Sequence, residues 1–316
     1  MPGATGFSFV GIAKETTKGT AVAASVYIPV TSMDGDDTVD VLQDNSMRAS
    51  MATLFGAVPG TKQSSFSIEG DVYVDTIGWF LAGIMGATAF SAGTPNTHTF
   101  TLLNSGSGQC RSYSITDYNG LQTRRYAACT ESSFSLRLAA QELLTYSSQF
   151  AGYASATLSA PTPSFSALDP IAGWVGTISL GGSPNALLEE LDLTFTRNVS
   201  PVFTVDGDQT PSLLWQGPLS VSGRMMLIAD AETEFTKYLA VTKSALVVTL
   251  TQGTASLAVT MTSVVYTSAK IERGDDFTQV SVQFEAIANT TDAGPSGGFA
   301  PAKVVLMNSV ATGTYD

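Results

Sequence analysis

The residue types that most often carry out chemistry are scarce in this chain. Its one histidine, His98, has no second histidine to join it, so neither a Ser-His-Asp arrangement nor a multi-histidine zinc site can be completed. Two cysteines, Cys110 and Cys129, stand 19 positions apart and could face one another across a hairpin. Because a cytoplasm keeps thiols reduced, we expect Cys110 and Cys129 to be two buried thiols. Their spacing does not resemble that of a metal site.

Three carboxylate pairs are the remaining candidates for catalysis: Asp36-Asp37, Glu189-Glu190 and Asp275-Asp276. Two carboxyl groups at a suitable separation can hydrolyse a glycoside, but a sequence does not give that separation. Two of these pairs stand beside loop glycines, where solvated charge or an opportunistic calcium contact is commoner. The Gly-rich stretches 181–185 and 294–298 lack the lysine and helix of a phosphate loop and indicate turns. We therefore expect no catalytic, cofactor-binding or metal-binding residue, and no enzyme.

Composition favours a folded protein with an acidic surface. Of the 316 residues, 44% are hydrophobic and 13% are charged, which is enough for one large domain or two of ordinary size. The 15 basic and 27 acidic residues give a net charge of −12, the wrong sign for a tight grip on nucleic-acid phosphates. Such a surface could let DNA slide past without sticking, although ordinary solubility is the simpler explanation. No apolar run approaches a membrane span and residues 1–7 do not resemble a secretory signal, so a cytoplasmic protein is expected.

Most of the chain alternates hydrophobic with polar residues, which predicts two-faced antiparallel strands. The clearest examples are, in chain order, 66–74, 131–139, 191–196 and 278–286. Only Asp75–Met85 and Asp230–Val241 look helical, each with an acidic residue near its start, where the helix dipole favours negative charge. The sequence therefore predicts a mainly β protein.

One pattern occurs twice, half a chain apart. Each copy is a strand with a central glycine, Gly70 or Gly223, that runs into a helical segment, and the two glycines are offset by 153 residues. A long alternating strand closes each half, Glu131–Ala139 in the first and Thr278–Ala286 in the second. Any two β-rich halves share strands, turns and a helix, so duplication competes with that simpler explanation. The predicted boundaries are a first module at 1–155, a Pro-containing linker at 156–174 and a second module with a C-terminal tail at 175–316.

Several short stretches follow one another in an order typical of a single family. The opening Glu15-Thr16-Thr17-Lys18-Gly19-Thr20 leads into the apolar strand 26–30. A glycine-centred strand and helix follow at 67–86, and the stretch 110–120 leads into 132–138. In this order the chain resembles bacteriophage tail tube (major tail) proteins, many of which start with a Glu-Thr-x-x-Gly-Thr pattern before an apolar strand.

The resemblance implies a fold of duplicated antiparallel β-sandwich or barrel modules, each with one flanking α-helix. In such proteins the long first loop, here 31–62, carries an arm that reaches a neighbouring subunit. Strands of neighbouring subunits would form a ring, and rings would stack into an acidic-lined tube for DNA ejection. The implied partners are copies of the chain itself, the tape measure, tail terminator and tail-tip or baseplate proteins, and passing double-stranded DNA, without membrane insertion. The protein would belong to the virion tail and assemble in the host bacterial cytoplasm.

Single-module proteins of this family typically form hexameric rings, so a two-module chain would build the same pseudo-six-fold ring from three copies. The first alternative is a true hexamer in which the second half is a decoration domain. A second is a carbohydrate-binding β-sandwich adhesin, with Trp79, Trp174 and Trp215 as candidate sugar platforms. Of these, Trp79 lies in an apolar helical run and is expected in the core. A polysaccharide-degrading enzyme is disfavoured by the scarcity of histidine.

Overall fold

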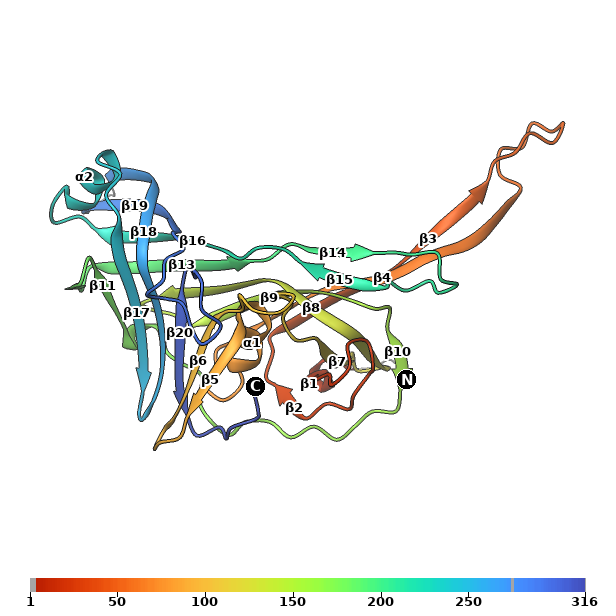
Figure 1. Ribbon diagram of the computed structural model, residues 1–316, viewed down its shortest axis with the longest axis horizontal. Coiled ribbons are helices and arrows are strands. Elements are labelled where there is room, and N and C mark those ends of the chain that lie inside the picture. The colour runs from red at the N-terminus through yellow and green to blue at the C-terminus, as the bar shows by residue number, and fades with distance from the viewer. Residues whose placement is uncertain (1–3, 274–275, 316) are drawn as a thin grey trace.

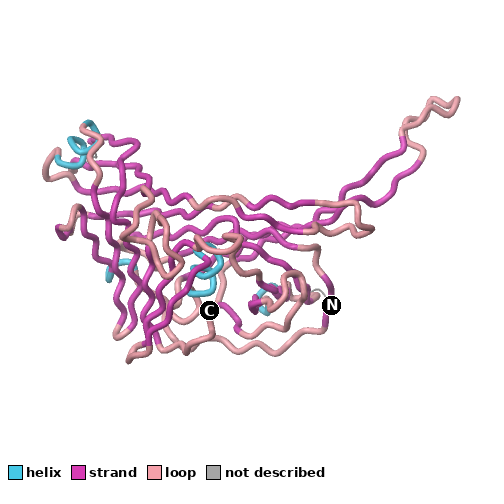
Figure 2. Tube along the Cα trace, in the orientation of Figure 1, coloured by secondary structure: helices cyan, strands magenta, loops and turns pink. Residues whose placement is uncertain are grey.

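The computed structural model describes residues 4–273 and 276–315 and consists mainly of antiparallel strands (Figure 1). Figure 2 shows how little of this described range is helical. The predicted mainly β fold is confirmed, with the sheets open and not closed into a barrel. Asp275 lies outside the described residues, so the carboxylate pair predicted there is not placed.

The largest sheet, here called the main sheet, includes strands from both halves of the chain. In spatial order its described strands are β3 (Ser32–Asp44), β4 (Gly56–Asp71), β9 (Thr145–Gly152), β8 (Thr123–Ala139), β13 (Leu188–Thr196), β16 (Ser220–Ile228), β19 (Thr278–Ala286) and β18 (Ala255–Arg273). Every neighbouring pair in this order is antiparallel. The β8–β13 ladder aligns Ser133–Ala139 with Glu190–Thr196 and joins the two halves into one continuous sheet.

Two smaller sheets share strands with the main sheet. One runs through β12 (Ser183–Asn185), β11 (Gly176–Leu180), β17 (Ser244–Gln252), the first part of β18, β20 (Lys303–Asn308), β6 (Asn96–Leu102) and β5 (Gly86–Ser91). The other runs through β2 (Val26–Ile28), β1 (Phe9–Lys14), β7 (Tyr113–Tyr118), the first part of β8 and β10 (Ala156–Leu158). Strands β14 (Val199–Val202) and β15 (Leu213–Gln216) form a separate hairpin. β8 and β18 are long because each passes from one sheet into another.

The two α-helices follow the two glycine-containing strands but differ in burial. All eight residues of α1 (Gly78–Met85) are buried, and the helix packs against β8, β6 and β5. None of the residues of α2 (Thr233–Leu239) is buried, and it packs on β18 and β19. Both predicted helices are confirmed in shorter form, since Asp75 and Asp230 precede the first helical residue. Single 3-10 turns occur at Thr5–Phe7 and Gly173–Val175.

The hydrophobic core lies along the inner side of the main sheet. Phe134, Leu136 and Leu138 of β8 are buried, and they are in register with the buried residues Phe195, Leu193 and Leu191 of β13. Burying a leucine or phenylalanine side chain stabilises a fold by about 1.5–3 kcal/mol. The alternation read from the sequence therefore correctly identifies the inward residues where the two halves meet.

The strand order bears on the predicted repeat. β4 lies between β3 and β9 in the way that β16 lies between β13 and β19, and Gly70 and Gly223 lie in β4 and β16. The predicted correspondence of Glu131–Ala139 with Thr278–Ala286 is wrong. Thr278–Ala286 is β19, whose position matches that of β9, whereas Glu131–Ala139 belongs to β8, whose position matches that of β18. Alternation alone cannot separate neighbouring strands that share a buried face.

The C-terminal segment, predicted as the tail of the second module, packs on the first half. β20 pairs with β18 on one side and with β6 on the other. Tyr315 is buried against Trp79 and His98, and its hydroxyl donates to the Asp75 carbonyl at 2.6 Å. The last strand therefore ties the two halves together a second time.

We predict that Gly223→Val destabilises the protein more than Gly70→Val does. A Cβ atom at Gly223 would lie 2.5 Å from the Asp192 carbonyl oxygen and 2.5 Å from the Phe284 ring, whereas at Gly70 the nearest atom would lie 3.1 Å away. Overpacking of this kind costs about 1–3 kcal/mol, and we expect Gly223→Val at the upper end. Urea unfolding at equilibrium measures the difference. Gly56→Val is the control, because its nearest neighbour is 3.7 Å away, and equal losses for all three variants would contradict the steric explanation.

Candidate functional site

The outward side of the main sheet is mostly polar, and we call it the polar face. Its polar members are Ser32, Asp34 and Asp36 of β3, Ser65, Ser67, Glu69 and Asp71 of β4, Thr145, Ser147 and Gln149 of β9, Ser133, Ser135 and Arg137 of β8, Glu190, Asp192, Thr194 and Thr196 of β13, Ser220, Ser222 and Arg224 of β16, Gln279, Ser281, Gln283 and Glu285 of β19, and Ser268, Lys270 and Glu272 of β18. The same registers place five apolar residues on this side, Ala139, Ala151, Met226, Ile228 and Val265. Because paired residues point to the same side, these side chains form rows across the strands. Among these described residues acidic side chains outnumber basic ones, so the face is short-chained, hydroxyl-rich and acidic.

One row places an aspartate between two arginines. Asp192 is in register with Arg137 on β8 and with Arg224 on β16. Arg137 Nη2 lies 2.7 Å from Glu190 Oε1, and Arg224 Nε donates to Ser281 Oγ at 3.3 Å. Burial and then Glu190 raise the pKa of Asp192 above its ordinary value, while Arg137 and Arg224 oppose the shift. The positive charges of this row therefore have carboxylates beside them.

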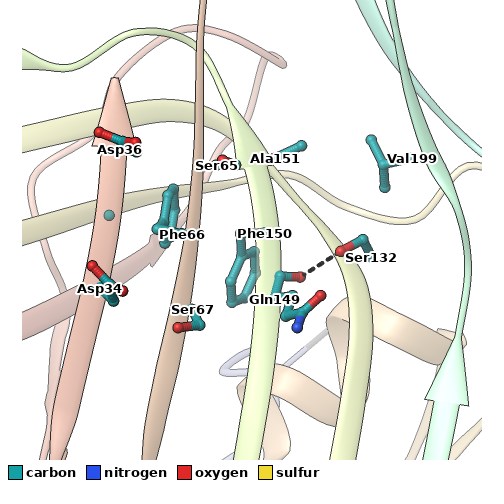
Figure 3. A pocket seen from close by; sticks show the side chains of 11 residues that line it. Asp34, Asp36, Ser65, Phe66, Ser67, Ser132, Gln149, Phe150, Ala151 and Val199 are labelled. Carbon is teal, nitrogen blue, oxygen red and sulfur yellow. Dashed lines mark hydrogen bonds between the residues drawn. The ribbon is translucent and has the colours of Figure 1, made fainter. Parts of the chain in front are cut away.

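The end of the polar face near β3 forms a hollow of about 540 Å³ (Figure 3). Asp34 and Asp36 line it from β3, Ser67 from β4 and Gln149 from β9. Ser132 Oγ donates to the Gln149 carbonyl at 3.1 Å and fixes the far wall. None of the described residues that line this hollow is basic, so they provide no positive charge to attract a phosphate.

The β3–β4 hairpin extends far beyond the body of the molecule (Figure 1). Its outer part exposes apolar side chains, among them Val41, Met47 and Met51, and both methionines are fully exposed. The β14–β15 hairpin lies along its base, where the Lys62 amide donates to the Gln209 carbonyl at 2.7 Å. The predicted arm at 31–62 thus corresponds to a long, supported hairpin with an apolar tip.

Glu15, from the Glu-Thr-x-x-Gly-Thr motif, holds the first strands against β8. The Gly19 amide and Ser112 Oγ donate to its Oε2 at 2.8 and 2.7 Å. Ser114 Oγ and the Ala128 amide donate to Oε1 at 2.8 and 2.9 Å. A carboxylate that accepts four hydrogen bonds is well satisfied although Glu15 is buried. The motif therefore has a structural explanation, which is to position β8.

A second polar cluster joins the base of the β14–β15 hairpin to the first half. The buried Arg197 donates from Nη2 to the Gly108 carbonyl at 2.9 Å and from Nη1 to Cys110 Sγ at 2.7 Å. Gln216 Nε2 donates to the Glu131 carbonyl at 2.8 Å, and its Oε1 accepts from the Cys110 amide at 3.0 Å. Burial raises the pKa of Cys110 to about 11, with Arg197 opposing the shift. A thiol held neutral in this way packs as a structural group.

Glu131 carries a carboxyl group that lies wholly inside the first half. Ser148 Oγ donates to its Oε1, its Oε2 has no hydrogen-bond partner, and Gly83 of α1 lies directly over it. Burial raises its pKa well above the ordinary value. Burial therefore favours the neutral, protonated form of this side chain.

Residues proposed from sequence as possible catalytic groups do not come together. His98 is buried, with Nε2 3.1 Å from the Val310 carbonyl and its ring against Tyr315. Cys110 and Cys129 are both buried and both free, as predicted. Across residues 4–273 and 276–315, no three His, Cys, Asp or Glu side chains gather closely enough to hold a metal ion. Within the same range, no helix has the length and apolar character needed to cross a bilayer.

The remaining candidate residues are also separated. Asp37 accepts a hydrogen bond from the Ser155 amide at 2.9 Å, while Asp36 points onto the polar face. Trp79 is buried in α1, as predicted, whereas Trp174 and Trp215 are exposed on different elements. No sequence pattern indicated the buried polar contacts of Arg197 and Gln216 or the burial of Glu131. Of the buried polar residues described above, Glu15 alone lies in a motif noted in the sequence.

We predict that Glu15→Gln destabilises the protein by about 1–3 kcal/mol, although glutamine has the same shape. An amide keeps one acceptor oxygen, so its NH₂ group must face either the Gly19 or the Ala128 backbone amide and leave that donor unsatisfied, whereas the serine hydroxyl on the same side can turn and accept. Thermal and urea unfolding measure this loss. Glu142→Gln is the control, because its side chain is exposed. A loss no larger than that of Glu142→Gln would contradict the structural importance of the four hydrogen bonds.

We predict that Glu131→Gln removes a pH dependence from stability. The native carboxyl keeps its proton above the pH at which the unfolded one loses it, so the unfolded state gains stability as pH rises from about 4.5 towards the raised native pKa. Over that window the wild-type unfolding free energy falls by up to about 1.4 kcal/mol per pH unit from this group. Urea unfolding from acid to alkaline pH should show a shallower fall for Glu131→Gln. Parallel profiles for the two proteins would contradict a buried neutral acid.

A comparison with known protein families identifies one family that matches this chain. A family model described as phage tail tube protein matches residues 8–286, most of the 316-residue chain and including Glu15, α1 and the main-sheet strands. A search of curated proteins found no match. The predicted relationship is therefore confirmed, and the role that it supports is structural rather than enzymatic and lies in the tail of a virion. The chain belongs to the phage tail tube protein family.

Proposed function

We propose that copies of this chain join edge to edge through the main sheet, so that the polar face lines the lumen of a ring. The observation that supports this most directly is the main sheet itself, which brings strands of both halves into one surface with a single polar side. Rings then stack into a tail tube through which the genome leaves the capsid. A surface of short hydroxyl side chains and carboxylates repels phosphate and keeps DNA mobile.

The two ends of the main sheet suit pairing with a neighbouring copy. At one end, β3 pairs only with β4 among the described strands. At the other, residues 265–273 of β18 pair only with β19 among them, and α2 lies beside that edge. An unpaired strand edge presents backbone donors and acceptors to another chain. A head-to-tail contact between unlike edges closes into a ring when the rotation per copy divides a full turn.

The width of the sheet favours three copies over six. Eight described strands per copy, about 4.8 Å apart, give twenty-four strands in a trimer, a circumference of about 115 Å and a diameter of about 37 Å. Strand tilt increases the diameter of the backbone ring further. The side chains that point inward reduce the diameter of the open lumen by about 10 Å in total. The resulting lumen admits a duplex about 20 Å across. Six copies would give a diameter of about 73 Å by the same spacing, far wider than the duplex.

The domain organisation follows from the same proposal. We infer a repeat in which β3, β4, β9 and β8 of the first module, 1–155, correspond to β13, β16, β19 and β18 of the second, 175–316, with 156–174 as the linker. A ring of three chains then has pseudo-six-fold symmetry. The alternative of a hexamer with a second-half decoration domain requires that half to lie outside the lumen, whereas β13 continues the sheet directly from β8. The adhesin alternative lacks an observation that favours it.

In the assembled tube, the apolar tip of the β3–β4 hairpin packs on a neighbouring subunit. Met47 and Met51 are fully exposed in the single chain and would be covered by that contact. Tape measure, tail terminator and tail-tip proteins are the further partners that the family suggests, with assembly in the host cytoplasm. Hydrophobic burial at the tip would then contribute to the strength of the tube.

We predict that the purified protein forms rings or tubes in negative-stain electron microscopy, with a central hole of about 20 Å or more, wide enough for a DNA duplex. Averages of end-on views give the hole, and the mass per ring separates three copies from six. A mass of six chains would contradict the trimer. Filaments without a central hole would contradict the tube.

We predict that Met47→Asp with Met51→Asp abolishes tube formation and leaves the fold intact. Charged side chains at the tip cannot be buried against a neighbour without a large desolvation penalty. Circular dichroism checks folding and electron microscopy checks assembly. Phe7→Asp with Leu121→Asp introduces the same charge at two other exposed apolar positions and is the control. Normal tubes from the arm variant would show that the tip has no part in assembly.

A further inference from the structure

The basic side chains of the polar face lie close to acidic ones. Lys270 Nζ lies 3.3 Å from Glu272 Oε1, and Arg137 Nη2 lies 2.7 Å from Glu190 Oε1. Arg224 is in register with Asp192 across the β13–β16 ladder. The acidic residues are less restricted, since Asp34 and Asp36 line their hollow without a basic neighbour in it. Each of these three basic side chains therefore has a carboxylate beside it, whereas Asp34 and Asp36 have no basic side chain in their hollow.

The central row is the place where DNA phosphate would otherwise bind. Asp192 borders two hollows, one of about 390 Å³ shared with Arg137 and one of about 360 Å³ shared with Arg224. Gly70 lines the first and Gly223 the second, so both hollows lie beside strand positions without a side chain. Each hollow gives an anion access to a guanidinium group on an otherwise flat sheet.

A guanidinium group binds carboxylate and phosphate through the same planar donors, so the two ligands compete. Glu190 engages Arg137 directly, and Asp192 lies next to both arginines in its row. Phosphate would have to displace a tethered carboxylate and approach its negative charge. Without these carboxylates, the two arginines would offer adjacent phosphate contacts on the β8–β13–β16 part of the sheet.

We propose that Glu190 and Asp192 act as internal competitors that keep Arg137 and Arg224 from binding the phosphates of double-stranded DNA. This inference rests on the proposed function, in which the polar face lines the lumen. Arg137 stabilises the β8–β13 junction of the two halves through its pairing with Glu190, whereas Arg224 lies opposite Asp192 on the next ladder, β13–β16. The acids prevent both arginines from retarding DNA. Specific pairing, and not net charge alone, then makes the face non-adhesive.

The test is DNA binding by the full chain at concentrations where it is unassembled, measured by fluorescence anisotropy with a short labelled duplex at about 50 to 200 mM salt. Glu190→Gln with Asp192→Asn removes the carboxylates that the proposal assigns to the two arginines, and leaves Arg137 only the exposed Glu142, whose Oε2 lies 3.7 Å from its Nε. Asp34→Asn with Asp36→Asn is the matched control, because it removes the same charge from the same face at positions without a paired cation. Circular dichroism verifies folding of each variant. If the first pair does not fold, Glu190→Gln is compared with Asp34→Asn.

We expect the wild type and the control to bind weakly, and the Glu190/Asp192 variant to bind at least tenfold more tightly at the lowest salt. Two added phosphate contacts should steepen the dependence of log K on log salt by about 1.8. Equal binding by both variants, whether weak or strong, overturns the inference and leaves the proposed function standing. Tight binding by the wild type overturns the non-adhesive lumen itself. The two failures are therefore distinguishable in one experiment.

Discussion

The structure depends on the change of sheet that β8 makes between Ala128 and Ser132. Before this point β8 pairs with β7 and β10, and after it β8 pairs with β9 and β13. Ala128 has a left-handed backbone with φ of 55°, which a non-glycine residue adopts only where its surroundings hold it. Glu15 binds the Ala128 amide, Gln216 binds the Glu131 carbonyl, and the Arg197 amide donates to the Ser132 carbonyl at 2.7 Å. Polar groups from three distant parts of the chain thus fix one bend.

That bend has consequences well beyond β8. It directs the second part of the strand into the β13 ladder, and this ladder is what makes one sheet out of two halves. An antiparallel pair with one buried face has a fixed register, because a slip by one residue would turn Phe134 and Leu136 outward. The same constraint places Ser133, Ser135 and Arg137 outward. The polar face is therefore a result of how the core is built, and its composition can vary without altering the core.

The sequence allows the regular strands to be predicted, but not the places where they change direction. Alternation identified Phe134 to Leu138 and Leu191 to Phe195 correctly, because a period of two is a local signal. Glu131 shares the parity of Ser133 and yet is fully buried, because a bulge between Glu131 and Ser133 reverses the side to which the earlier residues point. Arg197 and Gln216 contact residues about ninety to a hundred positions away, and no local pattern announces such contacts. Gly70 and Gly223 do lie in strands with similar neighbours in the sheet, but the strands expected to close the two halves do not have matching positions, because alternating strands look alike.

A lumen for DNA has to satisfy two opposing physical requirements. It must be polar, since the sheet face is wetted, and yet it must not offer cations to a polyanion that passes within a Debye length of about 8–10 Å. A face of serine, threonine and glutamine meets the first requirement with neutral groups, and an excess of carboxylates meets the second. Arginine is nevertheless useful at the junction of the two halves, where cross-strand ion pairs favour the correct register. If the polar face lines the lumen as proposed, placing Asp192 between Arg137 and Arg224 reconciles these demands, because these charges are satisfied by one another before DNA arrives.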